Sequence, residues 1–365
     1  MLKVKSHDKF VRQHRYSLVV CSLFLSVLGF IVGSLEATAQ NAQDSDVRSP
    51  PTSDGREATV IVDAAWEPDR VISPRDGHLQ CVQFSQGGSL VSVSGDRLIQ
   101  TFSPHTGELE RVYEGATDEV IRFDFSPDEQ LVAGGLGDGN VLIWNARTTE
   151  VIAKLTGHGD QIIGVQFSPD GRWLASTAAF HDGTVRIWDT TSWNQVASAK
   201  TAPRTNGMFL AWSPNSKRIA SSEYRGGVRL YSFEDAELRL LFSGNHDDGE
   251  MVSHVCFAPD GQTFVTSSWD RTLRCWDAED GRQIWQATAP KYARCFDASL
   301  FSPDGNRIYS VTRDETIEMR DAKDGTLLLS RRWLDSAVRG FAISEDGKQV
   351  ATCGHDRQLK VWTLN

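Results

Sequence analysis

The sequence predicts an all-β protein: a seven-bladed β-propeller of four-stranded antiparallel blades, closed by an N-terminal strand. Two motifs that recur with one period predict it, together with a strand-like alternation of apolar residues inside each repeat. The first motif is Phe-Ser-Pro-Asp-Gly or a variant of it, at seven anchors spaced 41, 42, 45, 45, 44 and 42 residues apart. These anchors are Phe84, Phe125, Phe167, Trp212, Phe257, Phe301 and Ile343.

Residues 1–39 precede the repeats and have the pattern of an export signal. Five basic residues lie before an uncharged apolar run, Ser17–Leu35, and Ala37–Ala39 follows as a small-residue cleavage site. Cleavage after Ala39 predicts an exported protein, periplasmic or secreted. Because the run is about long enough to cross a bilayer, a membrane-anchored form with an uncleaved signal is the alternative. Residues 40–57, rich in Gln, Asp, Ser and Pro, are predicted to form a flexible linker.

The charge balance narrows the classes of partner. Lys and Arg number 38 against 48 Asp and Glu, a net charge of −10. Removal of residues 1–39 leaves 33 against 46, or −13. Binding to nucleic acid requires a basic surface for the phosphates. We therefore expect no nucleic-acid partner, and no membrane contact beyond the N-terminal anchor.

Each repeat is predicted to contain four strands. In the third repeat, apolar alternation leads into Phe167, and Pro-Asp-Gly makes a turn into a second run, Trp173–Ser176. A second motif, Asp-Gly-Thr-Val-Arg-Ile-Trp-Asp from Asp182, turns into the third strand. A shorter fourth run, such as Val151–Leu155 in the preceding repeat, completes the unit. Four antiparallel strands cannot bury both of their faces alone, so a radial ring of seven units is predicted.

The last repeat is one strand short. It ends on Leu359–Trp362, with no fourth strand after it. The segment Ala58–Ile72 precedes the first repeat and contains the apolar run Thr59–Val62. We expect this segment to join the last blade and close the ring, because an unpaired strand edge would otherwise be exposed. The propeller is then predicted to occupy residues 58–365.

Period, copy number and the two motifs together resemble the WD-repeat family, in an exported, bacterial-type form, over residues 58–365. The resemblance implies a non-enzymatic scaffold. It also implies that four residues of the third repeat form a buried hydrogen-bond chain that ties the blade together. The same residue types could be taken for a Ser-His-Asp triad, but the sequence shows no nucleophile elbow, and we expect no catalytic residue. The four residues are His158, Ser176, Asp182 and Trp188.

Only the third repeat is expected to hold this complete set. The second has Ala116 where the His belongs, and the sixth has Arg320 in place of the Trp. The fourth has Arg225 in place of the Asp and Tyr231 in place of the Trp. We expect such imperfect blades to depend more on apolar packing.

No cofactor and no metal is expected. The histidines after residue 39 show no HExxH spacing, and the nearest metal-like cluster, His246–Asp248, falls at the Gly-His turn of the family. No Walker loop or GxGxxG is present. Most of the five cysteines after residue 39 lie in apolar strand patterns and are predicted to be structural thiols, with one disulfide left open in an oxidising compartment. They are Cys81, Cys256, Cys275, Cys295 and Cys353.

One face of the ring is the predicted binding surface. The loops that enter the first strands and the turns between second and third strands share this face, which we call the loop face. Arg, Trp, Tyr and His gather there, and aromatic residues and Arg are enriched at binding hot spots. The alternative interpretation is that such residues are simply common in loops. The predicted loop-face residues are His181, Tyr224, Arg225, Trp269, Arg271, Tyr292, Arg294, Arg313, Trp333, Arg339, His355 and Arg357.

We therefore expect a monomeric, non-enzymatic scaffold in an extracytoplasmic compartment that grips an acidic or aromatic-bearing segment of another protein or peptide. The alternative is an extracytoplasmic propeller enzyme, or a small-ligand-binding protein, with a site in the central channel. Fold alone does not decide between them. The expected channel-side starts of the first strands are a thin set for catalysis and favour binding. They are His78, Glu119, Gln161, Asn206, Met251, Cys295 and Ala337.

Overall fold

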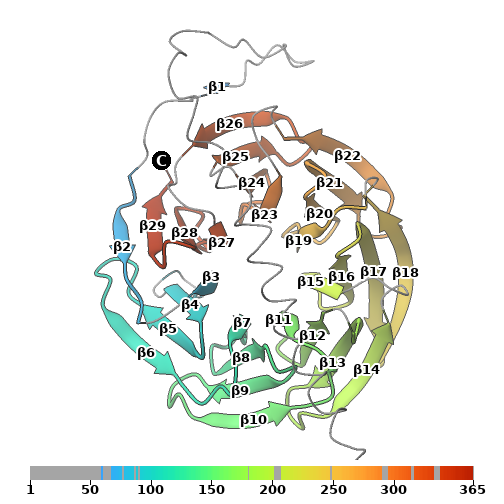
Figure 1. Cartoon of the computed structure of the whole chain (residues 1–365). Helices are drawn as coiled ribbons and strands as arrows, with labels where there is room; N and C mark the ends of the chain where they lie inside the picture. The colour runs from blue at the N-terminus through green and yellow to red at the C-terminus, as the bar shows by residue number, and fades with distance from the viewer. Residues whose placement is uncertain are drawn as a thin grey trace, which may run out of the picture. The chain divides into compact units, whose positions relative to one another are not determined.

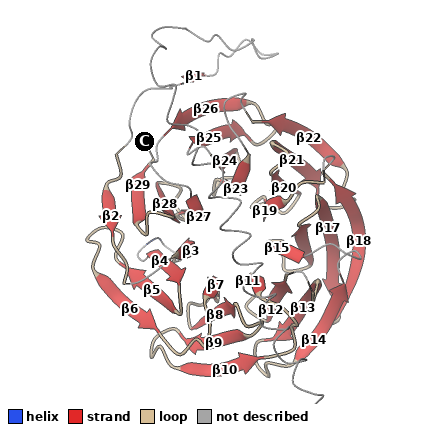
Figure 2. Cartoon of the chain, in the orientation of Figure 1, coloured by secondary structure: helices blue, strands red, loops and turns tan. Residues whose placement is uncertain are grey.

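A computed structural model shows a ring of seven blades around a central channel (Figure 1). It describes residues 59–60, 67–75, 78–85, 88, 91–179, 181–200, 207–246, 249–289, 295–313, 316–332 and 338–364. Every element from β1 to β29 is a strand (Figure 2). In these ranges no helix has the length and apolar character needed to cross a bilayer. The predicted all-β, seven-bladed propeller with four-stranded antiparallel blades is confirmed.

Each blade is a meander in which the first strand lies at the channel and the fourth at the rim (Figure 1). Blades one to three consist of β3 (Leu79–Phe84), β4 (Val91–Gly95), β5 (Leu98–Phe102), β6 (Leu109–Tyr113); β7 (Val120–Phe125), β8 (Leu131–Leu136), β9 (Val141–Asn145), β10 (Val151–Leu155); β11 (Ile162–Phe167), β12 (Trp173–Ala178), β13 (Thr184–Asp189) and β14 (Gln195–Lys200).

The remaining blades follow the same order around the ring. Blades four and five consist of β15 (Gly207–Trp212), β16 (Arg218–Glu223), β17 (Gly227–Glu234), β18 (Glu237–Asn245); β19 (Val252–Phe257), β20 (Thr263–Ser268), β21 (Thr272–Asp277) and β22 (Gln283–Thr288). Blades six and seven contain β23 (Phe296–Phe301), β24 (Arg307–Thr312), β25 (Thr316–Asp321), β26 (Leu327–Arg332); β27 (Val338–Ile343), β28 (Gln349–Gly354) and β29 (Leu359–Thr363).

The recurring Ser-Pro-Asp-Gly string makes the turn between the first and second strands. In the third blade, Ser168 Oγ donates to Asp170 Oδ1 at 2.5 Å and accepts from the Trp173 N–H at 3.0 Å. Gly171 has a φ of 71°, a left-handed conformation that glycine adopts without steric cost. The side chains of the motif therefore replace backbone partners in the turn, which explains why the same residue types recur at each anchor.

The hydrophobic core lies between neighbouring blades. One cluster joins Ile143 and Leu155 of the second blade to Phe167, Leu174 and Trp188 of the third. The tryptophans at the equivalent third-strand positions are buried in the same way, because a flat ring packs against the sheet of the adjacent blade. Each blade thus buries its two faces only when both neighbours are present. The ring is the unit that stabilises every strand.

The N-terminal pairing differs from the expectation in its residues. Strand β2 (Arg70–Ile72) pairs antiparallel with β29, with Arg70 opposite Val361 and Ile72 opposite Leu359. The segment Ala58–Ile72 therefore reaches the last blade through its final three residues, while Ile61 and Val62 of the expected run lie outside the described residues. Strand β1 (Thr59–Val60) instead pairs parallel with the rim strand β26 of the sixth blade. An apolar run does not by itself determine which open edge it joins, whereas Ile72 is buried against the core of the last and first blades.

All five described cysteines are free thiols. Cys81 and Cys353 come near one another where the seventh blade meets the first, but they pack into different cores. Cys353 lies in the core between the seventh and first blades, whereas Cys81 packs against the core between the first and second. Their side chains therefore lie on opposite sides of β3.

Candidate functional site

The four residues singled out in the third blade lie in one hydrogen-bonded chain. Trp188 Nε1 donates to Ser176 Oγ at 2.8 Å, and His158 Nε2 lies 2.7 Å from the same oxygen. His158 Nδ1 lies 3.1 Å from Asp182 Oδ1, and the Gly159 N–H donates to Asp182 Oδ2 at 2.7 Å. These hydrogen bonds join β12 and β13 to the turn between them and to the loop that enters the blade.

The protonation states and burial of these four residues are those of a structural hydrogen-bond network. Burial lowers the pKa of His158 to about 4, so the ring is neutral at pH 7. Burial alone would raise the pKa of Asp182, but hydrogen bonds from Thr184, Gly159 and His158 outweigh it and hold the pKa at about 2. Ser176 is fully buried and its Oγ is capped by the indole N–H of Trp188, so no substrate reaches it. The order Ser-His-Asp is therefore present without access to the serine.

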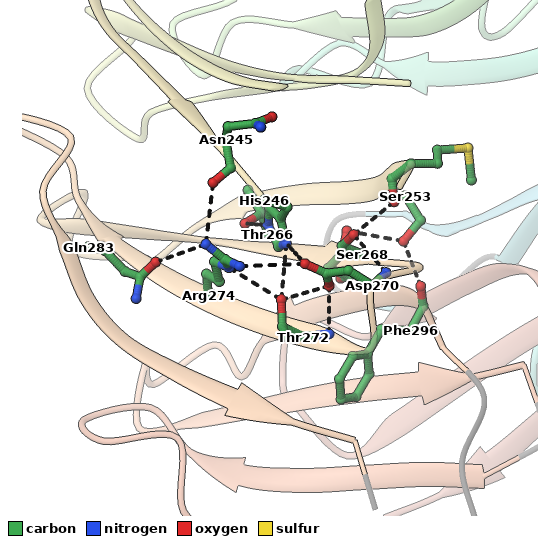
Figure 3. A network of polar contacts seen from close by, with 12 residues as sticks. Asn245, His246, Ser253, Thr266, Ser268, Asp270, Thr272, Arg274, Gln283 and Phe296 are labelled. Carbon is green, nitrogen blue, oxygen red and sulfur yellow. Dashed lines mark hydrogen bonds and ion pairs between the residues drawn. The ribbon is translucent and has the colours of Figure 1, made fainter. Parts of the chain in front are cut away.

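The fifth blade holds the same network, so the expectation that only the third blade has it is wrong. Trp276 Nε1 donates to Thr266 Oγ1 at 2.8 Å, and His246 Nε2 lies 2.8 Å from that oxygen. His246 Nδ1 lies 2.9 Å from Asp270 Oδ2 (Figure 3). Threonine supplies here the hydroxyl that serine supplies in the third blade.

This network also accounts for the histidine of the metal-like cluster. His246 is fully buried, and both of its ring nitrogens face side chains of its own blade. Asp247 and Asp248 lie outside the described residues. Within the described part of the chain, no group of three or more His, Cys, Asp or Glu side chains is placed to hold a metal ion.

Two blades that lack the tryptophan hold buried ion pairs. In the sixth blade, Arg320 donates to Glu318 Oε2 from NH2 at 2.7 Å and from Nε at 2.9 Å. In the fourth, Arg229 Nε donates to Glu223 Oε1 at 2.5 Å. The expectation that these blades depend mainly on apolar packing was therefore incomplete. The available sequence signal was a Glu near the position where the Trp is replaced. In the sixth blade Glu318 lies two residues before Arg320, and in the fourth Glu223 lies on the strand before Tyr231.

On the loop face, the fifth and sixth blades bring two predicted residues into contact. The Cζ atom of Arg313 lies 4.4 Å from the ring centroid of Trp269, a cation–π arrangement. Trp269 is held at its backbone by a hydrogen bond from its N–H to the Met251 carbonyl. Arg271, two residues on, has a φ of 71° and donates from NH2 to the Ala289 carbonyl at 3.4 Å.

A second pair lies on the seventh blade. Arg339 Nε donates to His355 Nε2 at 3.3 Å, and Arg339 NH1 donates to Gln80 Oε1 at 2.7 Å. Burial, followed by the charges of Arg339, His78 and Arg313, lowers the pKa of His355, so its ring is neutral at pH 7 and accepts this bond. The hydrogen bond from Arg339 to Gln80 thus joins the last blade to the first.

The other predicted loop-face residues are more separate. His181 is exposed, and its Nδ1 lies 2.7 Å from Asp160 Oδ2. Arg225 and Arg357 are exposed, and Tyr224 is half-buried. The structure therefore brings together two pairs, Trp269 with Arg313 and Arg339 with His355. Tyr292, Arg294 and Trp333 lie outside the described residues.

The central channel contains a cavity of about 590 Å³. It is lined mainly by the first strands, including Gln80, Arg122, Phe209, His254 and Arg339. The residues expected at the channel-side starts of the first strands do not line this cavity where the structure describes them. His78, Glu119, Gln161, Met251 and Cys295 are absent from the lining, while Asn206 and Ala337 lie outside the described residues.

Comparison with known proteins identifies the repeats. Four segments match the family model described as WD domain, G-beta repeat: residues 107–145, 149–189, 238–277 and 331–363. The chain is 31% identical over 166 residues to "Protein FIZZY-RELATED 3" of Arabidopsis thaliana, which covers 45% of this chain and 34% of that protein. It is 27% identical over 214 residues to "Eukaryotic translation initiation factor 3 subunit I" of Aspergillus oryzae, covering 56% of this chain and 63% of that protein.

A more distant similarity extends to "Apoptotic protease-activating factor 1" of Mus musculus, at 23% identity over 243 residues, 56% of this chain and 19% of that protein. The chain thus spans about a third of the first of these relatives and less than two thirds of each. The three come from a plant, a fungus and a mammal. The resemblance to an exported, bacterial-type protein stays a prediction.

Proposed function

From a chain that carries WD40 repeats in a seven-bladed propeller, we propose a protein-interaction scaffold that holds a segment of its partner on the loop face. The observation that carries this proposal is the stack of Arg313 on Trp269. A guanidinium that rests on an indole loses little further freedom when it binds, so it can serve as an anchor. The relatives support a non-enzymatic role only through the shared repeats.

The charges on this face favour an acidic or aromatic-bearing segment. Among the described residues the Arg313 side chain forms no ion pair, and its guanidinium lies over the Trp269 ring. Arg339 and His355, in the seventh blade, add a second polar anchor. On a chain of net charge −10, such a local cationic group would steer an acidic segment to this face.

Affinity capture from an extract of the native host tests the proposal. The bait variant is Trp269→Ala with Arg313→Glu. The matched control is Arg172→Glu, because Arg172 also stacks on a tryptophan, Trp173, with its Cζ 5.4 Å from the ring, but in a turn between first and second strands on the opposite face. We expect a specific band that wild type and control retain and the loop-face variant loses. Identical bands from all three baits would refute the proposal.

Export, cleavage and oligomeric state are part of the same proposal. We propose that residues 1–39 direct export, that cleavage follows Ala39, and that the mature chain is a monomer. N-terminal sequencing of the protein from its host would give Gln40 as the first residue. Retention of residues 1–39 in a membrane fraction would favour the anchored alternative. Light scattering of the purified chain would report a dimer if the monomer proposal is wrong.

A further inference from the structure

The channel cavity has the size of a small-molecule site. At about 590 Å³ it lies within the range of about 300 to 1,000 Å³ that is usual for ligand pockets. All seven first strands contribute to its wall. Its two arginines enter from the two blades that flank the first.

Gln80 of the first blade holds both of these arginines. Arg122, from β7 of the second blade, donates from NH1 to the Gln80 backbone carbonyl at 2.8 Å. Arg339, from β27 of the seventh blade, donates from NH1 to Gln80 Oε1 at 2.7 Å. One residue therefore positions two guanidinium groups that come from opposite sides of it. In each group the NH2 nitrogen donates to no side chain or carbonyl of the described residues.

Arg122 is further held from across the channel. Its Cζ lies 4.9 Å from the ring centroid of Phe209, which belongs to the fourth blade. The third blade, which lies between, lines the cavity with Ile163, Gly164, Val165 and Gln166. The guanidinium is thus fixed by an aromatic ring and by carbonyl oxygens, with no ion pair to a described carboxylate.

Carboxyl groups lie close to the two arginines: Gln80 Nε2 donates to Glu119 Oε1 at 2.6 Å, and Asp124 lines the cavity. Asp124 accepts from Gln83 Nε2 and from the Phe167 N–H, both at 2.7 Å, and burial raises its pKa to about 7. The Asp124 carboxyl is therefore partly protonated at pH 7. Asp297 and Glu345 also line the cavity. Burial lowers the pKa of Arg339, as do the nearby charges of Arg122 and Arg313, whereas Glu119 acts in the opposite direction.

We propose that the channel binds a small molecule bearing an oxyanion, a carboxylate or a phosphate, between Arg122 and Arg339. Two guanidinium groups held in advance match the oxygens of such a group, because their N–H donors lie in fixed planes. Gln80 acts as the positioning residue that brings the two together. This site lies on the first strands and shares Arg339 with the proposed loop-face anchor, so Arg122 is the arginine that belongs to the channel site alone.

Calorimetric titration of the full chain with malonate and, separately, inorganic phosphate tests this site. Sodium chloride at the same ionic strength is the blank for each. We expect saturable heat with at least one of the two anions, and the anion that binds identifies the class as carboxylate or phosphate. Arg122→Gln and Arg339→Gln should each raise Kd by about tenfold to a hundredfold, since each removes a charge-assisted hydrogen bond. Arg147→Gln, which removes an exposed arginine of the turn between β9 and β10, should leave Kd unchanged.

Two results would overturn the proposal: no saturable heat from either anion with wild type, or the same Kd in wild type, Arg122→Gln and Arg339→Gln. Arg339 is the more exposed of the two, so its variant keeps the test valid if Arg122→Gln does not fold. Arg122→Lys tests whether the planar donors of arginine matter in addition to its charge. It keeps the charge but loses the planar pair of donors, so Kd should rise by less than in Arg122→Gln.

Discussion

Replacement of His246 by alanine should destabilise the whole ring, because this one side chain joins two neighbouring strands of the fifth blade to the loop before it. Its Nε2 lies 2.8 Å from Thr266 Oγ1 and its Nδ1 lies 2.9 Å from Asp270 Oδ2 (Figure 3). The ring is fully buried and the Asp270 side chain is 2% exposed, so water does not replace the lost donor without entering the core.

The magnitude follows from these contacts. A hydrogen bond to a charged group contributes about 1.5 to 3 kcal/mol, and one between neutral groups about 1 kcal/mol. The bonds to Asp270 and Thr266 together give a loss of about 3 kcal/mol in the free energy of unfolding. In a domain of about 300 residues, each kcal/mol lowers the melting temperature by about 2 °C. We expect His246→Ala to melt about 6 °C below wild type.

Urea unfolding followed by tryptophan fluorescence, with scanning calorimetry on the same samples, measures this difference. His181→Ala is the matched control, since His181 also pairs with an aspartate, Asp160, but its side chain is 86% exposed. Exposed pairs contribute about 0 to 1 kcal/mol. If His246→Ala lost no more stability than His181→Ala, the structural interpretation of the network would be refuted.

Three further predictions concern the same scaffold. Arg320→Met takes from the buried Glu318 its arginine partner and should cost about 3 to 5 kcal/mol in urea unfolding, whereas a Glu318→Met, Arg320→Met double variant should regain most of that loss. Deletion of residues 1–74 removes β2 from the edge of β29 and should lower the melting temperature; an unchanged value would exclude a closing role for β2. The pKa of His158 lies at about 4 in the folded chain, because of burial, against 6.5 when unfolded. Between pH 6.5 and 4 the unfolded chain therefore takes up the proton first, and acidification through this window should lower the free energy of unfolding by about 3 kcal/mol more in wild type than in His158→Asn, measured by urea titration at each pH.

The blades could be predicted from the sequence because their turns use side chains that are visible in it. Ser168 and Asp170 satisfy the backbone of one turn, and the same pair of residue types marks its copies. The tryptophan of the third strand is equally visible. The motif did not show that a threonine hydroxyl can take the place of the serine hydroxyl. The second network, in which Thr266 accepts from Trp276, was therefore not predicted.

The channel residues were beyond sequence reasoning for a geometric reason. Each first strand carries a register shift near its start, between Ile162 and Gly164 in β11 and between Val252 and His254 in β19. Such a bulge interrupts the alternation of side chains, so counting from the start of the strand gives the wrong inward set. Arg122 and Gln80 meet only because strands from two blades are adjacent there.

The pairing of β2 with β29 has a consequence for how the chain is made. The Asp69 carboxylate accepts from the Thr363 N–H at 2.5 Å, across 294 residues of sequence. The segment that completes the last blade leaves the ribosome long before the strand it pairs with, and six blades are synthesised in between. The nascent chain must therefore keep its early segment from pairing elsewhere until the final strand emerges, and the slowest step of ring formation should be the meeting of these two ends.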